Sequence, residues 1–242
     1  MPLNVPAGSH LLFQGDSLTD SGRDRAPAPG SAPGPGSDPG PGSDLERADA
    51  NASLGHGYVY LVAARAAARA PGHRWRFTNR GVSGDGVVDL AARWRTDTLE
   101  QAPDVLSVLV GVNDARRVVE GDCWDIDADH FREAYDELLA RTRRALPATR
   151  LLLCEPFCLP VGRDPDFDAA LAAQLQTRQK AVAELAAAHS AELVRLHPVF
   201  DEALRRAPAA HWSHDGVHPT PAGHQLLADA WVSAVAAGPH AR

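Results

Sequence analysis

Lysine, cysteine and long apolar runs are all scarce in this 242-residue sequence. Only one of its 24 basic residues, Lys180, is a lysine, and no GxxxxGK[ST] segment is present. A P-loop nucleotide site is therefore excluded, because that loop requires a lysine beside its glycines. A Schiff-base mechanism could use only Lys180, which lies within a helical pattern.

The three cysteines do not form a recognisable framework. Cys123, Cys154 and Cys158 are odd in number, which argues against a disulfide scaffold. No second cysteine pair or nearby histidine completes a zinc site around Cys154 and Cys158. We interpret all three as ordinary thiols and expect no metal and no cofactor.

Charge and hydropathy narrow the range of partners. The formal net charge is −7 and no segment forms a basic stripe, so we expect no nucleic-acid partner. No apolar run approaches the roughly 18 residues that a membrane span needs. The N-terminus lacks the charged start and apolar core of a secretory signal. We therefore expect no membrane association and a cytoplasmic location.

Glycine and proline are concentrated in one strip near the front of the chain. Residues 26–43 read APAPGSAPGPGSDPGPGS, and 11 of these 18 residues are Gly or Pro. Such a segment cannot bury enough apolar surface to order itself. We predict a single domain over residues 1–242 that carries this low-complexity strip as an insertion.

Short apolar runs alternate with longer helical patterns along the rest of the chain. Strands are predicted at 10–15, 75–81, 105–111, 150–154 and 192–197, each apolar enough to be buried on both faces. Helices are predicted at 57–70, 86–99, 129–146, 168–190 and about 221–238, with Asp129 and Thr220 as N-caps. This alternation predicts a parallel sheet with helices on both faces.

Four polar segments lie where such a sheet gathers its reactive groups, at the carboxyl ends of its strands. They cover residues 15–20, 79–84, 111–114 and, before the last helix, 215–220. Together they suit acyl transfer. A serine hydroxyl needs a base to take its proton, and the base needs a third group to fix its tautomer. Ser17, His218 and Asp215 are the candidates for nucleophile, base and orienting acid.

The tetrahedral intermediate of acyl transfer also needs donors aimed at its oxyanion. Three candidates are the backbone N–H of Ser17, the backbone N–H of Gly81 and the side-chain amide of Asn113. A glycine suits the second position because a side chain there could block close approach. Each segment alone is a weak signal, but all four in this order favour a catalytic site.

The same segments carry a family resemblance. GDSLTD, the glycine of NRGVSGDG, GVND and DGVHPT resemble, in order, the conserved blocks of the GDSL or SGNH hydrolases. The resemblance implies a flavodoxin-like α/β/α fold with a five-stranded parallel sheet, metal-free ester hydrolysis, and the same roles for Ser17, Gly81, Asn113, Asp215 and His218. The surrounding sequence is similar to bacterial carbohydrate acetyl esterases, including acetylxylan esterases, which implies deacetylation of plant-derived oligosaccharides.

Several further residues are candidates for substrate contacts. Trp212 and Trp94 could stack on a sugar ring, although packing is the commoner role of tryptophan. Arg116 could hydrogen-bond a substrate or pair with a carboxylate. His211, His214 and His224 lie near His218, but their spacing fits no metal motif, so we interpret them as solvated histidines.

Two rival functions remain open at this point. A lysophospholipase or thioesterase of the same family would act on lipid esters, and it would want an apolar channel. A non-catalytic carbohydrate-binding relative should have lost part of the Ser17, Asp215 and His218 set, and none is lost. The sequence also leaves open whether the chain forms a homo-oligomer.

Overall fold

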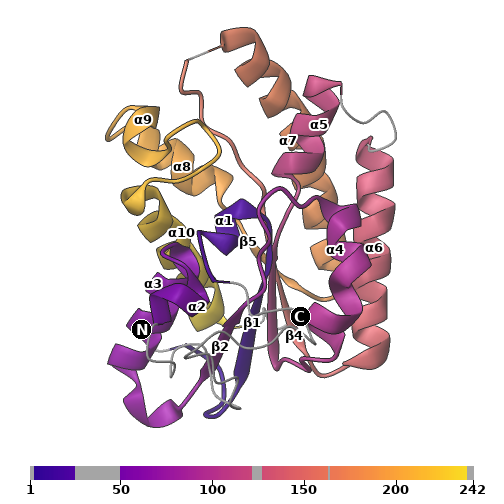
Figure 1. Ribbon diagram of the computed structural model, residues 1–242, viewed down its shortest axis with the longest axis vertical. Helices are drawn as coiled ribbons and strands as arrows, with labels where there is room; N and C mark the ends of the chain where they lie inside the picture. Colours follow the sequence, from indigo (N-terminus) through magenta and orange to yellow (C-terminus); the bar gives the residue numbers. More distant parts are fainter. Residues whose placement is uncertain (1–2, 25–49, 122–126, 163, 239–242) are drawn as a thin grey trace.

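Five parallel strands form one sheet at the centre of the molecule (Figure 1). The structure is a computed structural model that describes residues 3–24, 50–121, 127–162 and 164–238. The predicted insertion at 26–43 and Cys123 lie outside the described residues. The strands are β1 (His10–Gly15), β2 (Arg76–Asn79), β3 (Val105–Leu109), β4 (Arg150–Cys154) and β5 (Glu192–Val194). Their order across the sheet is β2-β1-β3-β4-β5, and every neighbouring pair is parallel.

The strands are apolar throughout because both of their faces are covered. Alternate side chains of a strand point to opposite faces. In β1, Leu11 and Phe13 belong to one core cluster and Leu12 to the other. All three side chains are fully buried. A two-sided core of this kind explains why the strand sequences lack polar alternation.

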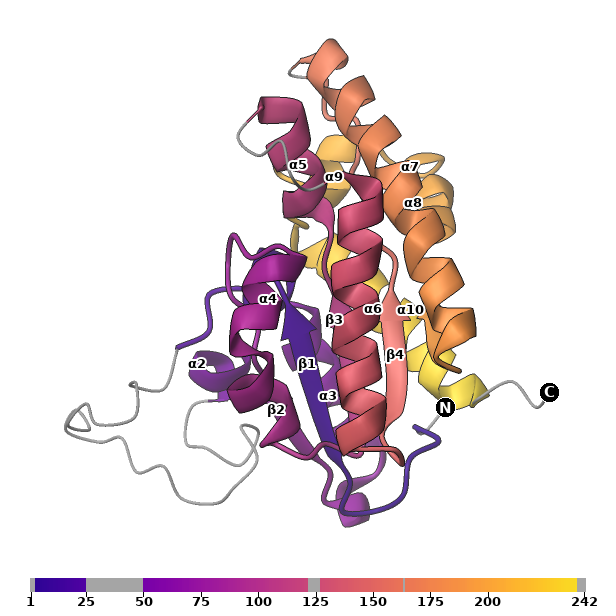
Figure 2. The same cartoon turned by 90° about the vertical axis from the view of Figure 1, so that its right-hand side faces the viewer.

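Helices cover both faces of the sheet, as expected from the sequence. One layer packs α3 (Tyr58–Arg69) and α10 (Pro221–Ala237) against each other, and the other packs α4 (Val87–Trp94), α6 (Ala128–Ala145) and α7 (Pro165–Ala188) (Figures 1 and 2). The prediction of a three-layer α/β/α sandwich around a five-stranded parallel sheet is confirmed.

Several short elements were not predicted from the sequence. They are α1 (Ser17–Asp20), α2 (Ala50–Leu54), η1 (Pro71–His73), α5 (Val112–Glu120), α8 (His197–Leu204) and α9 (Ala209–Trp212). The pattern at 86–99 also proves composite, because α4 is followed by the π-helical turn η2 (Arg95–Leu99). Helices this short gain little from propensity, so tertiary packing decides whether they form.

Of the two predicted N-caps, that of α10 agrees with the structure and that of α6 differs by two residues. Thr220 caps α10, its hydroxyl accepting from the Gly223 N–H at 3.3 Å. The cap of α6 is Asp127, not Asp129, and its carboxylate accepts from the His130 N–H at 2.9 Å. A residue accepting from an N–H three positions on satisfies a donor that the first helical turn leaves unpaired.

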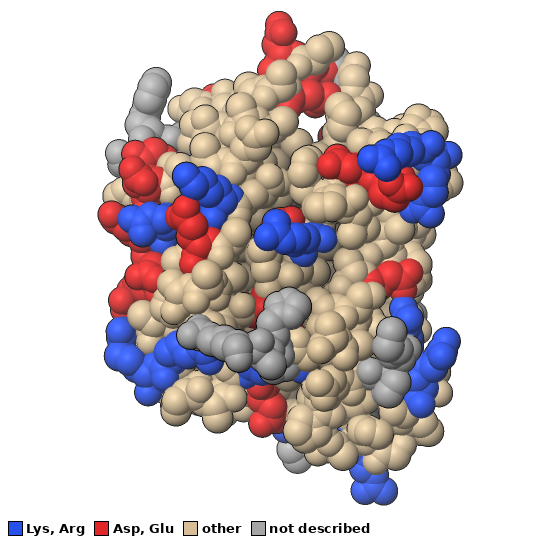
Figure 3. Space-filling model, turned by 180° about the vertical axis from the view of Figure 1, so that it is seen from behind, with Lys and Arg blue, Asp and Glu red and all other residues tan. Residues whose placement is uncertain are grey.

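Positively and negatively charged side chains lie next to one another on the face shown in Figure 3, with uncharged residues across much of its centre.

The described part of the chain contains no helix long and apolar enough to cross a membrane.

Candidate active site

Ser17 stands at the carboxyl end of the central strand β1, as the first residue of α1. The Asp16 side chain caps this helix by accepting from the Leu18 N–H at 3.0 Å. Gly15 makes the sharp turn possible, because a Cβ at this position would overlap the carbonyl oxygen of Leu109 on the neighbouring strand. The local sequence thus raises the Ser17 hydroxyl at the edge of the sheet.

Ser17 begins a continuous series of hydrogen bonds. Its Oγ lies 2.9 Å from His218 Nε2, and His218 Nδ1 lies 2.7 Å from Asp215 Oδ2. Asp215 Oδ1 also accepts from the backbone N–H groups of Val217 at 3.0 Å and His218 at 2.8 Å. The loop before α10 therefore presents its histidine to a serine that is 201 residues away in the chain.

The Asp215 carboxylate is held in its ionised form. Burial raises its pKa, but hydrogen bonds from the His218 backbone, the His218 ring and the Val217 N–H outweigh this and hold the pKa of Asp215 below its ordinary value. An ionised carboxylate at Nδ1 favours the tautomer with its proton on Nδ1. The lone pair of Nε2 then faces the Ser17 hydroxyl.

The prediction that Gly81 donates to an oxyanion is wrong. Its N–H is buried and donates to Asn79 Oδ1 at 2.9 Å. Gly81 is required for packing, since a Cβ there would overlap the backbone of Asp20 in α1. The glycine that faces the site is Gly84, three residues later in the same loop, at a φ of +88°.

The Gly84 and Ser17 N–H groups have no hydrogen-bond partner among the residues that the structure describes. Asn113, in the first turn of α5, lies on the same cavity. Its Nδ2 donates one hydrogen to the carbonyl oxygen of Asp85 at 2.9 Å. This bond fixes the amide and leaves its second hydrogen for a ligand.

A cavity of about 580 Å³ opens beside Ser17. Most of its lining side chains are polar, and none of the lining residues in the described part of the chain is a leucine, isoleucine, valine or phenylalanine. The lining residues are Ser17, Ser21, Gly22, His56, Ser83, Gly84, Asn113, Arg116, His214, His218, Pro219, Pro221 and His224. Such a lining presents a ligand with several hydrogen-bonding groups beside the carbon surface of the histidine and proline rings.

Both tryptophans predicted to contact substrate are placed elsewhere, so these predictions are wrong. Trp94 is fully buried within the core layer of α4 and α6, where its Nε1 donates to Thr142 Oγ1 at 3.0 Å. Trp212 is 7% exposed and its ring is covered by the Arg206 guanidinium, 5.1 Å from the ring centre. An aromatic ring could stack on a sugar, but both tryptophan side chains pack in the hydrophobic core instead.

Arg116 does line the cavity, where its Nε donates to Glu120 Oε1 at 2.6 Å. Its contact with substrate therefore stays a prediction. Sequence reasoning missed His56, on the loop before α3, as a lining residue. His56 lies outside the four polar segments at the strand ends, although LGHGYVYLV, which contains it, is part of the resemblance to carbohydrate acetyl esterases.

Of the three histidines interpreted as solvated, His211 and His214 are exposed but His224 is buried. Its Nδ1 accepts from the Tyr58 N–H at 3.2 Å. Burial, with a smaller effect from His56 and His214, lowers the pKa of His224 to about 4. His224 is therefore a neutral part of the cavity wall.

This burial predicts a pH-dependent contribution to stability. The unfolded chain has the ordinary pKa near 6.5 and takes up the proton first as the pH falls. The contribution of His224 to the free energy of unfolding is thus present above about pH 6.5 and is lost toward pH 4. His224→Asn keeps an acceptor for Tyr58 and removes the titration. In urea unfolding, the advantage of wild type over this variant should shrink in acid.

The comparison with the variant isolates His224 from a carboxyl group that acts in the opposite direction. Burial raises the pKa of Asp16 to about 7, so the folded chain holds a proton that the unfolded chain releases. The Asp16 contribution is present in acid and lost as the pH rises through about 7. If the free energy of unfolding of wild type exceeds that of His224→Asn by the same amount above pH 6.5 and near pH 4, the prediction is contradicted.

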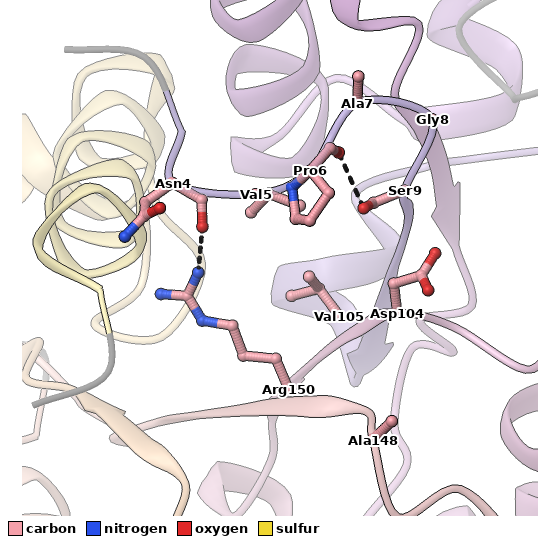
Figure 4. A pocket seen from close by; sticks show the side chains of 10 residues that line it. All are labelled: Asn4, Val5, Pro6, Ala7, Gly8, Ser9, Asp104, Val105, Ala148 and Arg150. Atoms are coloured by element: carbon pink, nitrogen blue, oxygen red, sulfur yellow. Dashed lines mark hydrogen bonds between the residues drawn. The ribbon is translucent and has the colours of Figure 1, made fainter. Parts of the chain in front are cut away.

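A second cavity, of about 420 Å³, lies at the opposite, amino end of the strands (Figure 4). Its charged groups are engaged within the protein. Arg150 donates to the Asn4 carbonyl oxygen at 2.7 Å and to Glu192 Oε2 at 2.7 Å. Asp104 accepts from the His10 N–H at 2.8 Å. These bonds fasten the N-terminal segment to the sheet, so we assign the reactive site to the Ser17 cavity.

A parallel α/β/α sandwich with a serine, a histidine and an aspartate hydrogen-bonded in series at its carboxyl edge has the architecture of a hydrolase. The chain belongs to the GDSL-like lipase/acylhydrolase family, whose model matches residues 13–226. It is a carboxylic ester hydrolase.

Individual relatives extend over nearly the whole chain. An acetylxylan esterase of Geobacillus stearothermophilus is 30% identical over 236 residues, which is 95% of each chain. The crystal structure of Axe2, an acetylxylan esterase from the same organism, has a TM-score of 0.79 at 28% identity and 96% coverage of each chain. LAE5, an alpha/beta hydrolase enzyme from the metagenome of Lake Arreo, Spain, has a TM-score of 0.78 at 32% identity, also with 96% coverage of each.

Proposed function

We propose that this chain is a serine esterase that removes acetyl and other small acyl groups from carbohydrate esters, foremost xylan-derived oligosaccharides. The observation that carries the proposal is the hydrogen-bonded series from Ser17 through His218 to Asp215 at a cavity lined by serine, histidine and asparagine side chains. A serine with a base at 2.9 Å, itself oriented by a carboxylate, is the arrangement that nucleophilic acyl transfer needs.

The first half of the reaction forms an acyl-enzyme. His218 Nε2 takes the proton of the Ser17 hydroxyl as Oγ attacks the ester carbonyl carbon, and Asp215 stabilises the imidazolium. The carbonyl oxygen becomes an oxyanion that accepts from the N–H groups of Ser17 and Gly84 and from Asn113 Nδ2. When the tetrahedral intermediate collapses, the bond between the acyl carbon and the sugar oxygen breaks, and His218 protonates the leaving alcohol.

The second half releases the acyl group by the same steps. Water replaces the sugar alcohol, His218 takes its proton, and the hydroxide attacks the acyl carbon of the ester on Ser17. The same three donors hold the second oxyanion. Collapse of that intermediate returns the proton to Ser17 and frees the carboxylic acid, so the cycle needs no metal or cofactor.

The lining of the cavity supports a small acyl group on a polar alcohol. A long acyl chain needs apolar surface to leave water. Among the residues that the structure describes, the lining offers serines, histidines, Asn113 and Arg116, with Pro219 and Pro221 as its aliphatic rings. The acetylxylan esterase from Geobacillus supports acetyl and xylan as the first choices.

A panel of esters tests this proposal. We expect kcat/KM for an aryl acetate to exceed that for the aryl octanoate by at least about tenfold, because a long chain laid against the lining would cover polar side chains without replacing their hydrogen bonds to water. Among acetylated sugars, acetylated xylo-oligosaccharides should have the highest kcat/KM. The variant Arg116→Ala should raise KM for the oligosaccharide while leaving the aryl acetate unchanged.

Two results would redirect the proposal. A preference for octanoate or for a lysophospholipid favours the lipid-esterase alternative. Binding of acetylated xylan with no turnover of any ester favours the non-catalytic alternative.

A further inference from the structure

Arg93, on α4, is hydrogen-bonded to the last residue of β1 and to the loop that follows β2, the two segments that lead to Ser17 and Gly84. Its Nη2 donates to the Gly15 carbonyl oxygen at 3.2 Å, and its Nη1 donates to the Arg80 carbonyl oxygen at 2.7 Å. Its Nε donates to Asp85 Oδ2 at 2.7 Å. Arg93 does not line the cavity, and its side chain is only 19% exposed. It therefore lies behind the site and acts on backbone segments, not on substrate.

The guanidinium is itself fixed from a third direction. Nη1 also reaches Gln14 Oε1 at 2.9 Å and Asp97 Oδ2 at 3.0 Å. The fully buried amide of Gln14 donates in turn to the Asp97 carbonyl oxygen at 3.0 Å and to Thr98 Oγ1 at 2.9 Å. The planar fork is thus fixed between β1 and η2, and a lysine ammonium cannot reproduce its geometry.

The acceptors of Arg93 flank the three proposed oxyanion donors. Gly15 lies two residues before Ser17, and Asp85 directly follows Gly84. The carbonyl oxygen of Asp85 accepts from Asn113 Nδ2 at 2.9 Å, which links the third donor to the same residue. One guanidinium therefore connects to segments that place all three donors.

We propose that Arg93 is a positioning residue for the oxyanion site, a role that rests on the serine-esterase function proposed above. Donors stabilise a transition state only when they are already aimed at the developing charge. Errors of about 1 Å can cost about 100-fold in rate. Both Asp85 and Asp97 pair with Arg93, so the cluster offers the oxyanion no net positive charge, and we ascribe the effect of Arg93 to geometry.

Two substitutions separate geometry from charge. Arg93→Lys keeps the positive charge and loses the fork, whereas Arg93→Ala loses both. We expect kcat for an aryl acetate to fall about 10- to 100-fold in each, with KM within about threefold of wild type. Added guanidinium ion should restore part of the kcat of Arg93→Ala and should not increase the kcat of wild type.

Arg150 provides a matched control at the far end of the sheet. Its side chain is 17% exposed, and it also pairs with a carboxylate, Glu192. It donates to the backbone carbonyl oxygens of Val235 and of Asn4, the latter bond shown in Figure 4. Arg150→Ala should lower the melting temperature and leave kcat of the folded enzyme unchanged. If the Arg93 variants lower only the melting temperature in the same way, the proposal is overturned.

A double-mutant cycle with Asn113→Ala gives the sharpest test. Loss of one oxyanion donor costs about 10²- to 10³-fold in kcat. If Arg93 acts by placing the donors, the combined loss in the double variant should be smaller than the product of the two single losses. Independent, multiplicative losses overturn the proposal. Ser17→Ala is measured alongside: if it is inactive while Arg93→Lys matches wild type, only the role of Arg93 fails, whereas an active Ser17→Ala removes the proposed function itself.

Discussion

Replacing Ser17 with alanine should lower kcat for an aryl acetate by about 10⁴-fold or more, because the methyl group leaves His218 without the hydroxyl that it activates. The hydroxyl that is removed lies 2.9 Å from His218 Nε2. The measurement is the initial rate at saturating ester, with circular dichroism to establish that the variant is folded. Any rate that remains should come from the oxyanion donors and from substrate binding.

A serine outside the cavity serves as the control. The Ser233 hydroxyl on α10 donates to the Asp229 carbonyl oxygen, and Ser233 is exposed. Ser233→Ala should keep the wild-type rate. If Ser17→Ala retained more than about a tenth of that rate, nucleophilic catalysis by Ser17 would be wrong.

Asp215→Asn should lower kcat by about 10³- to 10⁴-fold with little change in KM. The amide keeps an oxygen for the Val217 and His218 N–H groups, so the loop retains its shape. Its NH₂ group, however, favours the tautomer of His218 with a bare Nδ1 and its proton on Nε2, where it cannot accept from Ser17. The pKa of Asp215, already below its ordinary value, shows that the folded loop favours the ionised form which this substitution removes.

A surface pair of the same kind is the matched control. Asp201 lies 3.5 Å from His197 on α8, and both side chains are about half exposed. Asp201→Asn should leave kcat unchanged. If both substitutions have equally small effects, Asp215 does not orient the base.

The regular elements followed from sequence pattern because their cause is local. Strands β1 and β4 occupy the predicted ranges, since a run that is apolar on both faces fits only a covered sheet. Short helices such as α1 and α9 escaped prediction, because four residues carry too little periodicity to register.

The site was predictable to the extent that chemistry restricts residue type. A nucleophile, a base and an orienting acid have few alternatives at the carboxyl ends of strands, and the structure brings the chosen three into contact. A backbone N–H of glycine, by contrast, has no side chain whose chemistry indicates a catalytic role. In the sequence, Gly81 and Gly84 both lie in the segment at 79–84, and only the structure shows that Gly84 lines the cavity while the Gly81 N–H donates to Asn79.

The sequence by itself determined the α/β class, the order of the four polar segments and the scarcity of lysine that left a lysine-free mechanism. Tertiary structure decided everything that depends on contacts between distant segments. It buried Trp94 and Trp212 away from the cavity and placed His224 in the cavity wall. It also brought Arg93 against the end of β1, 78 residues away along the chain. The physical reason is that periodicity and residue chemistry are carried by neighbours in sequence, whereas burial and hydrogen-bond partners exist only once the chain has closed on itself.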